Sequence, residues 1–354
     1  AVHSGSVGEW HACALVNGGV HCWGDNLAFE LGTNNNTSSL VPVTVVGLSG
    51  VQEISSGWWQ SCAVVSGAAK CWGTNDVGQL GNNSAVESRH AVQVSGLTAG
   101  VQSVAVGHKF ACALVKGAVK CWGTNGNGQI GDNTATDRHI PTQVSGLASN
   151  VKAITAGLYH ACAHTGSQVQ CWGSNTAGRL GDNTNTARGI PTTVSGINGG
   201  VQQVRAGATH TCAIINGGAK CWGGNDLGQL GINSSDASNH PYPTTVSGAS
   251  SGMTSVIGGY WQSCTLSAAG GLRCAGSNTN GNIGDNATNG AADVPIAASV
   301  YGGTQSIDLF TSLGETNCAI IAGSVKSWGL NNYNQLGINS APATSVVPIT
   351  IYPF

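Results

Sequence analysis

The sequence predicts an all-β fold, a seven-bladed β-propeller of four-stranded antiparallel blades with disulfides inside single hairpins. Three observations predict it: a hairpin-like segment that occurs seven times, short apolar segments of alternating polarity, and cysteines in spaced pairs. Of the 354 residues, 41% are hydrophobic and only 8% are charged. No apolar stretch approaches the roughly 20 residues that a membrane-spanning helix needs, so we expect no membrane span.

The internal repeat has a period of about 50 residues, which is the first feature to establish in such a chain. The second cysteine of the hairpin falls at Cys22, Cys71, Cys121, Cys171, Cys221 and Cys274, and Ser327 takes its place in the seventh copy. We interpret the chain as one domain of seven repeats, at approximately 1-50, 51-100, 101-150, 151-200, 201-252, 253-304 and 305-354.

Each repeat contains about four short segments that favour Val, Ile and Thr and end at Gly, Asn or Pro. In the third repeat the first is VQSVAVG (101–107) and the last is IPTQVSG (140–146). This pattern is typical of strands, and no helical stripe of useful length occurs. Four short strands per repeat indicate a propeller blade, and seven blades close without long exposed edges. A solenoid is the alternative, but most solenoid units of this period contain helix.

The cysteine spacing indicates local disulfides. Cys13 and Cys22 are centred on Asn17-Gly18, a pair that favours a tight two-residue hairpin turn. Counting outward from the turn places the two cysteines opposite each other in a non-hydrogen-bonded pair, where side chains approach most closely. Cys264 and Cys274 enclose one residue more, which fits a three-residue loop. The spacing differs from that of zinc sites. The expected pairs are Cys13–Cys22, Cys62–Cys71, Cys112–Cys121, Cys162–Cys171, Cys212–Cys221 and Cys264–Cys274.

The segment GLYHACAHTGSQVQCWGSNTAGRLGDNTNTARGIPTTVSGI (157–197) resembles the repeat of the regulator of chromosome condensation family. That repeat runs Gly-x-x-His, a strand, a turn, Trp-Gly-x-Asn-x-x-Gly-Gln-Leu-Gly and Pro-x-x-Val. All seven units match in part, so the resemblance spans the chain and implies a propeller. Such a propeller resembles proteins as different as a nuclear exchange factor, a plant light sensor and a secreted bacterial β-lactamase inhibitor. The fold alone therefore does not indicate which function this chain has.

The chain departs from the family pattern at three places. The cysteine pairs are not part of the nuclear proteins' repeat, which implies an exported, bacterial branch. Ala275 stands where the other repeats have tryptophan. Ser327 stands opposite Cys318, which leaves Cys318 without a local partner. We expect Cys318 to be a buried free thiol, and pairing with another molecule is the alternative.

The sequence shows no pattern of a catalytic centre, so we predict that the protein is not an enzyme and uses no cofactor or metal. Nucleic acid is not an expected partner, because no basic stripe is present. Asp132, Asp182 and Asp285 recur at one loop position, where such a residue most often closes a turn through its own side chain. Calcium is the alternative. The repeated histidines His11, His160 and His210 are expected to be hydrogen-bonded at strand ends.

The aromatic residues fall into two groups. Six tryptophans occupy the Trp-Gly step and are expected to pack between blades: Trp23, Trp72, Trp122, Trp172, Trp222 and Trp328. The other group lies in the short connection before the first cysteine strand, which propeller closure would gather on one face. Tryptophan and tyrosine on such a rim suggest a binding surface. The predicted binding face is Trp10, Trp58, Trp59, Phe110, Tyr159, Tyr260 and Trp261. The alternative is that these rings only cap the blades.

The resemblance adds an expectation about this face. In the propeller-type β-lactamase inhibitory protein, loop-face aromatics of this kind bind the target enzyme. Carried over, the resemblance selects Trp10, Trp58, Trp59, Tyr159, Tyr260 and Trp261.

Thirteen cysteines in spaced pairs, Ala1 as first residue and Met253 as the one methionine favour a secreted, extracellular protein whose leader peptide has been removed. The first functional hypothesis is a non-catalytic module that binds a protein or glycan through the aromatic face. The second is a self-assembling subunit of a filament, sheath or surface layer, suggested by the low charge. The third is an inhibitor of a secreted enzyme such as a β-lactamase.

The final segment VVPITIYPF (346–354) matches the Pro-x-x-Val strand, while the N-terminal AVHSGSVG is a weak copy of the first strand. We expect the C-terminal strand to join the blade of the first hairpin and so close the ring.

Overall fold

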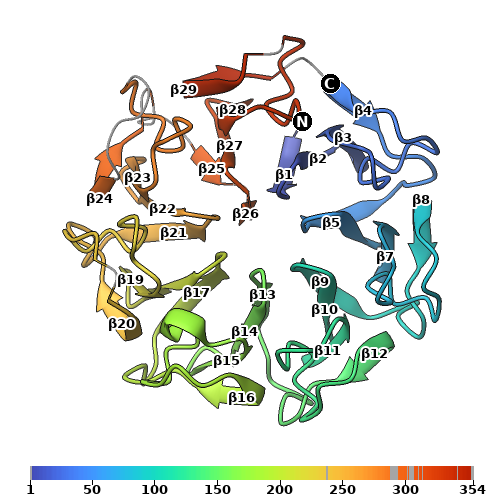
Figure 1. The fold of residues 1–354 in the computed structure, drawn as a ribbon, viewed down its shortest axis with the longest axis horizontal. Coiled ribbons are helices and arrows are strands. Elements are labelled where there is room, and N and C mark those ends of the chain that lie inside the picture. Colours follow the sequence, from blue (N-terminus) through green and yellow to red (C-terminus); the bar gives the residue numbers. More distant parts are fainter. Residues whose placement is uncertain are drawn as a thin grey trace.

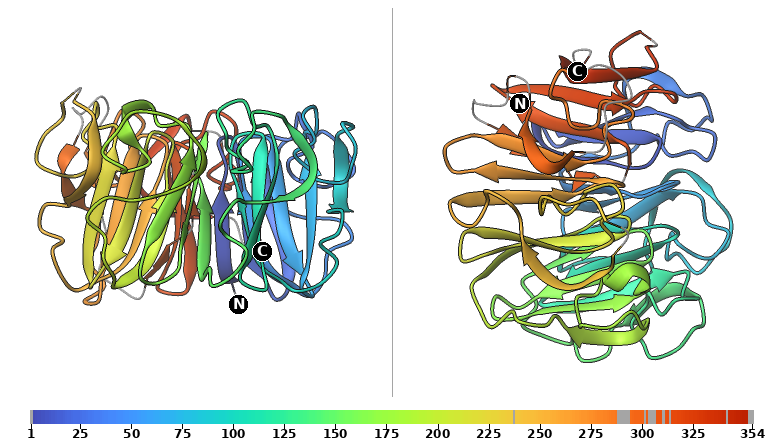
Figure 2. Two further views of the ribbon diagram at one scale, coloured as in Figure 1. Left: turned by 90° about the horizontal axis from the view of Figure 1, so that it is seen from below. Right: turned by 60° about the vertical axis from the view of Figure 1, so that its left-hand side comes forward.

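The computed structural model describes residues 2–236, 238–287, 294–300, 302, 307–309, 311–312, 314–340 and 342–351. These residues form seven sheets placed around one axis (Figure 1). In the side view of Figure 2 the molecule is a flat disc whose strands run from one face to the other. The predicted all-β, seven-bladed propeller is confirmed.

Each blade begins with an inner strand beside the axis and ends with an outer strand at the rim. The first three blades are β1 (Val2–Val7), β2 (His11–Val16), β3 (Gly19–Gly24) and β4 (Ser39–Thr44); β5 (Val51–Ser56), β6 (Gln60–Val65), β7 (Ala68–Gly73) and β8 (Ser88–Gln93); β9 (Val101–Val106), β10 (Phe110–Val115), β11 (Ala118–Gly123) and β12 (Arg138–Gln143).

The fourth and fifth blades are β13 (Ala153–Ala156), β14 (His160–His164), β15 (Val169–Gly173) and β16 (Arg188–Thr193); β17 (Val201–Ala206), β18 (His210–Ile215), β19 (Gly218–Gly223) and β20 (His240–Thr245). The sixth and seventh are β21 (Met253–Gly258), β22 (Gln262–Ser267), β23 (Leu272–Gly276) and β24 (Val294–Ser299); β25 (Ile307–Leu309), β27 (Thr316–Ile321), β28 (Ser324–Leu330) and β29 (Thr344–Thr350). A 3-10 turn, η1 (Thr176–Gly178), lies in a loop of the fourth blade. No helix in the described part of the chain is long and apolar enough to cross a membrane.

The hairpin between the second and third strands of a blade has the predicted register. In the first blade Asn17 and Gly18 both have positive φ, at 51° and 78°, as a tight primed turn requires. Cys13 and Cys22 are then directly opposite, with Cα atoms 4.0 Å apart, and form a disulfide. All six predicted pairs are disulfides within single blades. Cys318 is buried and free, opposite Ser327 in the same register.

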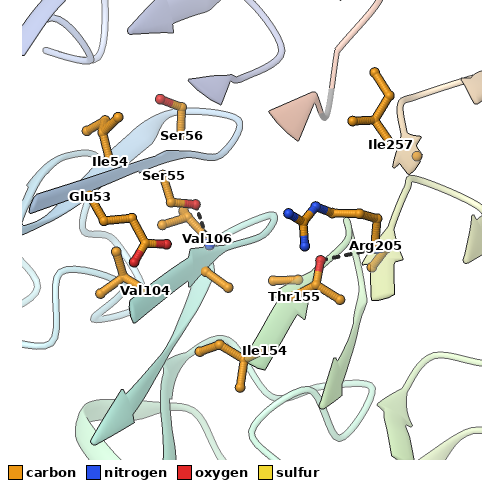
Figure 3. A pocket seen from close by; sticks show the side chains of 14 residues that line it. Glu53, Ile54, Ser55, Ser56, Val104, Val106, Ile154, Thr155, Arg205 and Ile257 are labelled. Atoms are coloured by element: carbon orange, nitrogen blue, oxygen red, sulfur yellow. Dashed lines mark hydrogen bonds between the residues drawn. The ribbon is translucent and has the colours of Figure 1, made fainter. Parts of the chain in front are cut away.

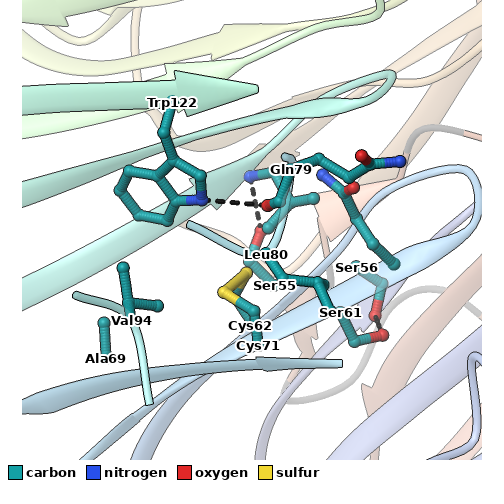
Figure 4. Close-up of a disulfide and its surroundings, with 12 residues drawn as sticks. Ser55, Ser56, Ser61, Cys62, Ala69, Cys71, Gln79, Leu80, Val94 and Trp122 are labelled. Carbon is teal, nitrogen blue, oxygen red and sulfur yellow. Dashed lines mark hydrogen bonds between the residues drawn. A yellow bond between two sulfur atoms is a disulfide. The ribbon is translucent and has the colours of Figure 1, made fainter. Parts of the chain in front are cut away.

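The tryptophan of each Trp-Gly step joins its blade to the preceding one. All six side chains are fully buried, and each indole N–H donates to a backbone carbonyl in a loop of the previous blade. Figure 4 shows Trp122 of the third blade donating to the Gln79 carbonyl, 2.9 Å away, beside the Cys62–Cys71 disulfide of the second. In the sixth blade, where Ala275 replaces the tryptophan, the Ser263 hydroxyl donates to the equivalent carbonyl, that of Gln229.

The expected closure of the ring by the C-terminal strand is wrong. β29 pairs with β28 inside the seventh blade, and β1 pairs with β2 to complete the first blade from its own residues. The first blade therefore leaves no place for β29, although β1 copies the inner-strand sequence only weakly.

Contacts between complete blades close the ring instead. β26 (Thr311–Ser312) pairs in parallel with β1. The Trp23 indole donates to the Gln335 carbonyl at 2.9 Å. Val7 and Trp23 of the first blade pack in one apolar cluster with Ile320 and Ile351 of the seventh.

Candidate binding face

Seven short connections between inner and second strands lie at the same face of the disc. In the first six blades the connection begins with a glycine whose N–H closes a tight turn; Gly57 donates to the Gln60 carbonyl at 2.8 Å. A Cβ on Gly57 would lie 2.4 Å from the carbonyl oxygen of Gly107, the equivalent glycine of the next blade. Because a side chain at these positions would separate neighbouring blades, glycine allows the connections to form a closed ring around the axis.

The aromatic side chains of these connections meet in one network. Trp58 has its ring centroid 5.3 Å from Trp59, 6.4 Å from Trp10 and 4.4 Å from His108. His108 is in turn 5.1 Å from Tyr159. These separations are those of stacked and edge-to-face aromatic pairs. We call this set of rings, with Tyr260 and Trp261, the aromatic face.

The network reaches across the axis. Trp58 belongs to the second blade and Tyr260 to the sixth, which are not neighbours, yet their rings are nearly parallel with centroids 6.4 Å apart. Tyr260 packs edge-on against Trp261 at 4.8 Å. Two non-adjacent blades place their side chains in contact only above the central channel. The aromatic face therefore covers one mouth of that channel, with its rings half-buried and their outer sides accessible.

Phe110 does not belong to the aromatic face, which corrects the sequence prediction. It is fully buried, at the start of β10, and packs in the blade core with Trp172. It occupies the strand position that the other repeats fill with His, Gln or, in the seventh, Thr316. At this position the side chain points into the blade rather than out of the connection.

Two aromatic members of the network were missed from the sequence. His108 follows Gly107 as Trp58 follows Gly57, and this shared repeat position was the signal that its ring would join the network. Tyr333 comes from the Asn-rich loop of the seventh blade and stacks on Trp10 at 5.0 Å. The Tyr333 side chain is 38% exposed, more than any other ring of the network. Its loop is remote in sequence from Trp10.

The long Asn-rich loops between third and fourth strands surround the aromatic face. In the third blade the Asn125 side chain accepts from the Ile130 N–H at 3.0 Å and donates to the Thr134 and Thr136 carbonyls. Asp132 accepts from the Thr134 N–H at 3.0 Å. Asp132, Asp182 and Asp285 all accept a backbone N–H two residues on, which confirms the expected turn-closing role.

The repeated histidines hold neighbouring blades together below the aromatic face. His11 Nε2 is 2.8 Å from the Ser61 hydroxyl, and His160 Nε2 is 2.8 Å from the Thr211 hydroxyl. The expected hydrogen-bonded role is confirmed for these two and is wrong for His210, whose two ring nitrogens are buried without a partner among the described residues. Burial lowers the pKa of His11 to about 3 and that of His210 to about 4.

Two carboxyl groups lie among the rings. Burial, together with the nearby charge of Glu315, raises the pKa of Glu9 to about 8. Burial also raises the pKa of Glu315, whose carboxylate accepts from the Asn280 amide at 2.6 Å. On the other side, Lys109 pairs with Asp76 and places its ammonium 5.3 Å from the Trp59 ring centroid. The face is therefore mainly apolar, with few charges.

Replacing Glu9 by glutamine should leave the melting temperature unchanged near about pH 4 and raise it increasingly as the pH goes from about 4.5 to about 8. The folded protein keeps the Glu9 proton up to about pH 8, whereas the unfolded chain loses it near 4.5. The folded state then binds more protons, so this group lowers stability as the pH rises through that window. Glutamine never ionises, so the variant does not lose this stability as the pH rises.

The measurement is the difference in melting temperature between variant and wild type across this pH range. Glu87→Gln, at an exposed site on the rim, is the control and should melt in parallel with the wild type. A Glu9→Gln difference that is the same at every pH would contradict the assignment.

The ring of repeated blades, each with a short connection at one face, defines a repeat-type β-propeller. Four segments of the chain, 17–64, 67–114, 116–164 and 168–214, match the regulator of chromosome condensation (RCC1) repeat and together cover more than half of the sequence. The chain therefore belongs to the family of RCC1-repeat propellers.

Solved structures show the same fold at low sequence identity. Yeast RCC1 (Prp20), in its structure bound to Kap60, superposes with a TM-score of 0.82 and 20% identity, over 94% of this chain and 83% of that one. Human WBSCR16 gives a TM-score of 0.81 with 18% identity, over 95% of both chains. The ectodomain of the Physcomitrella patens receptor kinase CR4 gives 0.55 with 19% identity, over 93% of this chain and 73% of that one. No curated protein sequence matches this chain significantly.

Proposed function

We propose that this protein is an extracellular, non-catalytic binding module that contacts another protein through the aromatic face. The observation that carries the proposal is the contact of Trp58 with Tyr260 over the axis, within a network that also includes Trp10. The network is a contiguous apolar surface whose rings already hold one another in place. Such rigid Trp and Tyr side chains supply much contact area at a small cost in conformational entropy.

The comparisons support protein as the partner class. Yeast RCC1 has been solved bound to the protein Kap60, and Prp20p from Saccharomyces cerevisiae is described with binding properties to Gsp1p and histones. Six disulfides support an oxidising, extracellular location for this chain, because such bonds are rare in a reducing cytosol. Inhibition of a secreted enzyme would be one form of this function.

A photo-crosslinking amino acid placed at Tyr333 or Trp261 should capture a partner protein when the purified variant is returned to the native extracellular material. The matched control is Tyr242 on β20, an aromatic residue of the rim that is 52% exposed. Because crosslinking needs direct contact, we expect adducts from Trp261 of the aromatic face and from Tyr333, which stacks on Trp10 of that face, and none from Tyr242. Adducts from both sites, or from neither, would contradict the proposal.

A second set of variants tests the energy of the contact. Trp10→Ala with Tyr260→Ala should reduce the yield of the Trp261 adduct more than about tenfold, since truncating a central aromatic contact typically costs 2 kcal/mol or more. Tyr242→Ala should leave the yield unchanged. If the double variant and Tyr242→Ala gave equal yields of the Trp261 adduct, the partner would not bind through Trp10 and Tyr260.

Self-assembly remains the second candidate because only 8% of the residues are charged, so copies repel one another weakly. In that case the captured adduct is a dimer of this chain, and light scattering shows association that is largely insensitive to salt. A glycan partner is the further alternative, and it would protect the Trp58 and Tyr260 rings without giving a protein adduct.

A further inference from the structure

The central channel contains a cavity of about 90 Å³ below the aromatic face. Inner strands of the second to sixth blades line it, through β5, β9, β13, β17 and β21. Most of the lining is small or apolar, as at Ala105, Val106 and Ile257. Two charged side chains, Glu53 and Arg205, extend into it from blades on opposite sides (Figure 3).

Arg205 departs from its repeat position. The inner-strand residue opposite the first cysteine of each hairpin is Ser6, Ser55, Ala105, Thr155, Arg205 and Ile257 in the first six blades. Several of the short side chains serve the fold, because Ser55 accepts from the Val106 N–H and Thr155 accepts from the Ala206 N–H, each at 3.1 Å. Arg205 makes no such bond to the next blade among the described residues. Its guanidinium is directed into the channel instead.

The guanidinium of Arg205 is incompletely paired. Its Nη1 donates to the Val204 carbonyl at 3.1 Å, whereas its buried Nε–H has no partner within the described chain. A buried N–H of a charged group without an acceptor is costly. Burial lowers the pKa of Arg205, and the charge of Glu53 opposes that shift. The Nε–H is therefore positioned to donate a hydrogen bond to an additional anionic group.

Glu53 is the counter-charge, but it does not reach the guanidinium. The ion pairs of the described residues do not include one between Glu53 and Arg205. Burial raises the pKa of Glu53 to about 7, and the positive charge of Arg205 opposes the rise. The cavity thus presents a carboxyl group at one side and a hydrogen-bond-donating cation at the other (Figure 3).

We propose that this cavity binds a small zwitterion, a molecule with one carboxylate and one ammonium group, of which a short-chain amino acid is the simplest example. The carboxylate accepts from the Nε side of Arg205, a geometry that guanidinium groups favour. The ammonium group donates to Glu53. The apolar wall at Val106 and Ile257 suits a short aliphatic side chain, and a volume of this size holds several water-sized groups.

This proposal is independent of the proposed function, because the cavity lies inside the ring and its ligand is measured without any partner protein. L-alanine is the probe, and acetate and methylammonium each carry one of its two charged groups. In titration calorimetry with the wild-type protein, L-alanine should bind at least about tenfold more tightly than either single-charge probe, since each charged group adds a charge-assisted hydrogen bond. The Nε–H resonance of Arg205 should shift on addition of L-alanine.

The double variant Glu53→Gln with Arg205→Gln keeps the cavity neutral and should weaken L-alanine binding at least about tenfold. Glu87→Gln with Arg89→Gln, an exposed pair on the rim, is the matched control and should bind as the wild type does. No L-alanine binding, equal binding of acetate, or full binding by the cavity variant would overturn the proposal. If the cavity variant does not fold, the wild-type comparison and the Arg205 resonance still decide it.

Discussion

Replacing Trp172 by alanine should lower the free energy of unfolding by about 3–5 kcal/mol, the range measured for truncating a buried aromatic side chain. The indole is fully buried between the third and fourth blades and contacts Gly131 of the third. Its N–H donates to the Gln129 carbonyl at 2.8 Å, so the variant also leaves a buried acceptor unpaired. Equilibrium unfolding in denaturant measures the change.

The sixth blade shows how this loss is reduced. There Ala275 occupies the tryptophan position, and the Ser263 hydroxyl donates to the Gln229 carbonyl. Ala161 is the residue opposite Trp172, as Ser263 is opposite Ala275. Adding Ala161→Ser to Trp172→Ala should therefore restore about 1 kcal/mol. A Trp172→Ala protein as stable as the wild type would show that inter-blade tryptophans do not hold the ring together.

Replacing Ser327 by cysteine should create a seventh disulfide, with Cys318, and raise the stability of the oxidised protein. Cys318 and Ser327 already face each other in the register that the six disulfide pairs occupy. Closing a loop of this length stabilises by up to about 3 kcal/mol in the chain-entropy description. Loss of the Ser327 hydroxyl bond to the Leu336 carbonyl, 2.6 Å long, subtracts about 1 kcal/mol. A net gain of about 1–2 kcal/mol is expected.

Ser327→Ala separates the two contributions, because it removes the hydroxyl without adding a thiol, and it should be less stable than the wild type. Thiol titration of unfolded Ser327→Cys protein should find none of the free cysteine that the wild type carries at 318. Burial raises the pKa of the Cys318 thiol, so the bond must form before the seventh blade is packed. A variant that keeps two free thiols after oxidative folding would contradict the register.

The features determined by the sequence alone are those that depend on a few neighbouring residues or on the repeat itself. Asn17-Gly18 specifies a turn, and the turn places Cys13 opposite Cys22 with no help from the rest of the chain. The period of the Trp-Gly step predicts seven equivalent blades. Trp10 and Trp58 each follow the repeated glycine between the first and second strands of a blade, so the repeat also predicts that they lie on one face of the disc.

The tertiary structure alone decided what lies between distant blades. Trp58 and Tyr260 are 202 positions apart in the numbering, and only closure of the ring brings their rings together over the axis. The same closure directs Glu53 and Arg205 into one cavity.

Phe110 and β29 show the same division. Phe110 has an aromatic side chain next to the connection, but its strand position turns that side chain into the core. β29 has a sequence suited to any outer-strand position, yet it pairs within its own blade because β1 completes the first. A repeat pattern specifies each blade and its turns because those contacts are short-range. Which side chains meet across the axis is set by ring geometry, since those contacts join segments far apart in sequence.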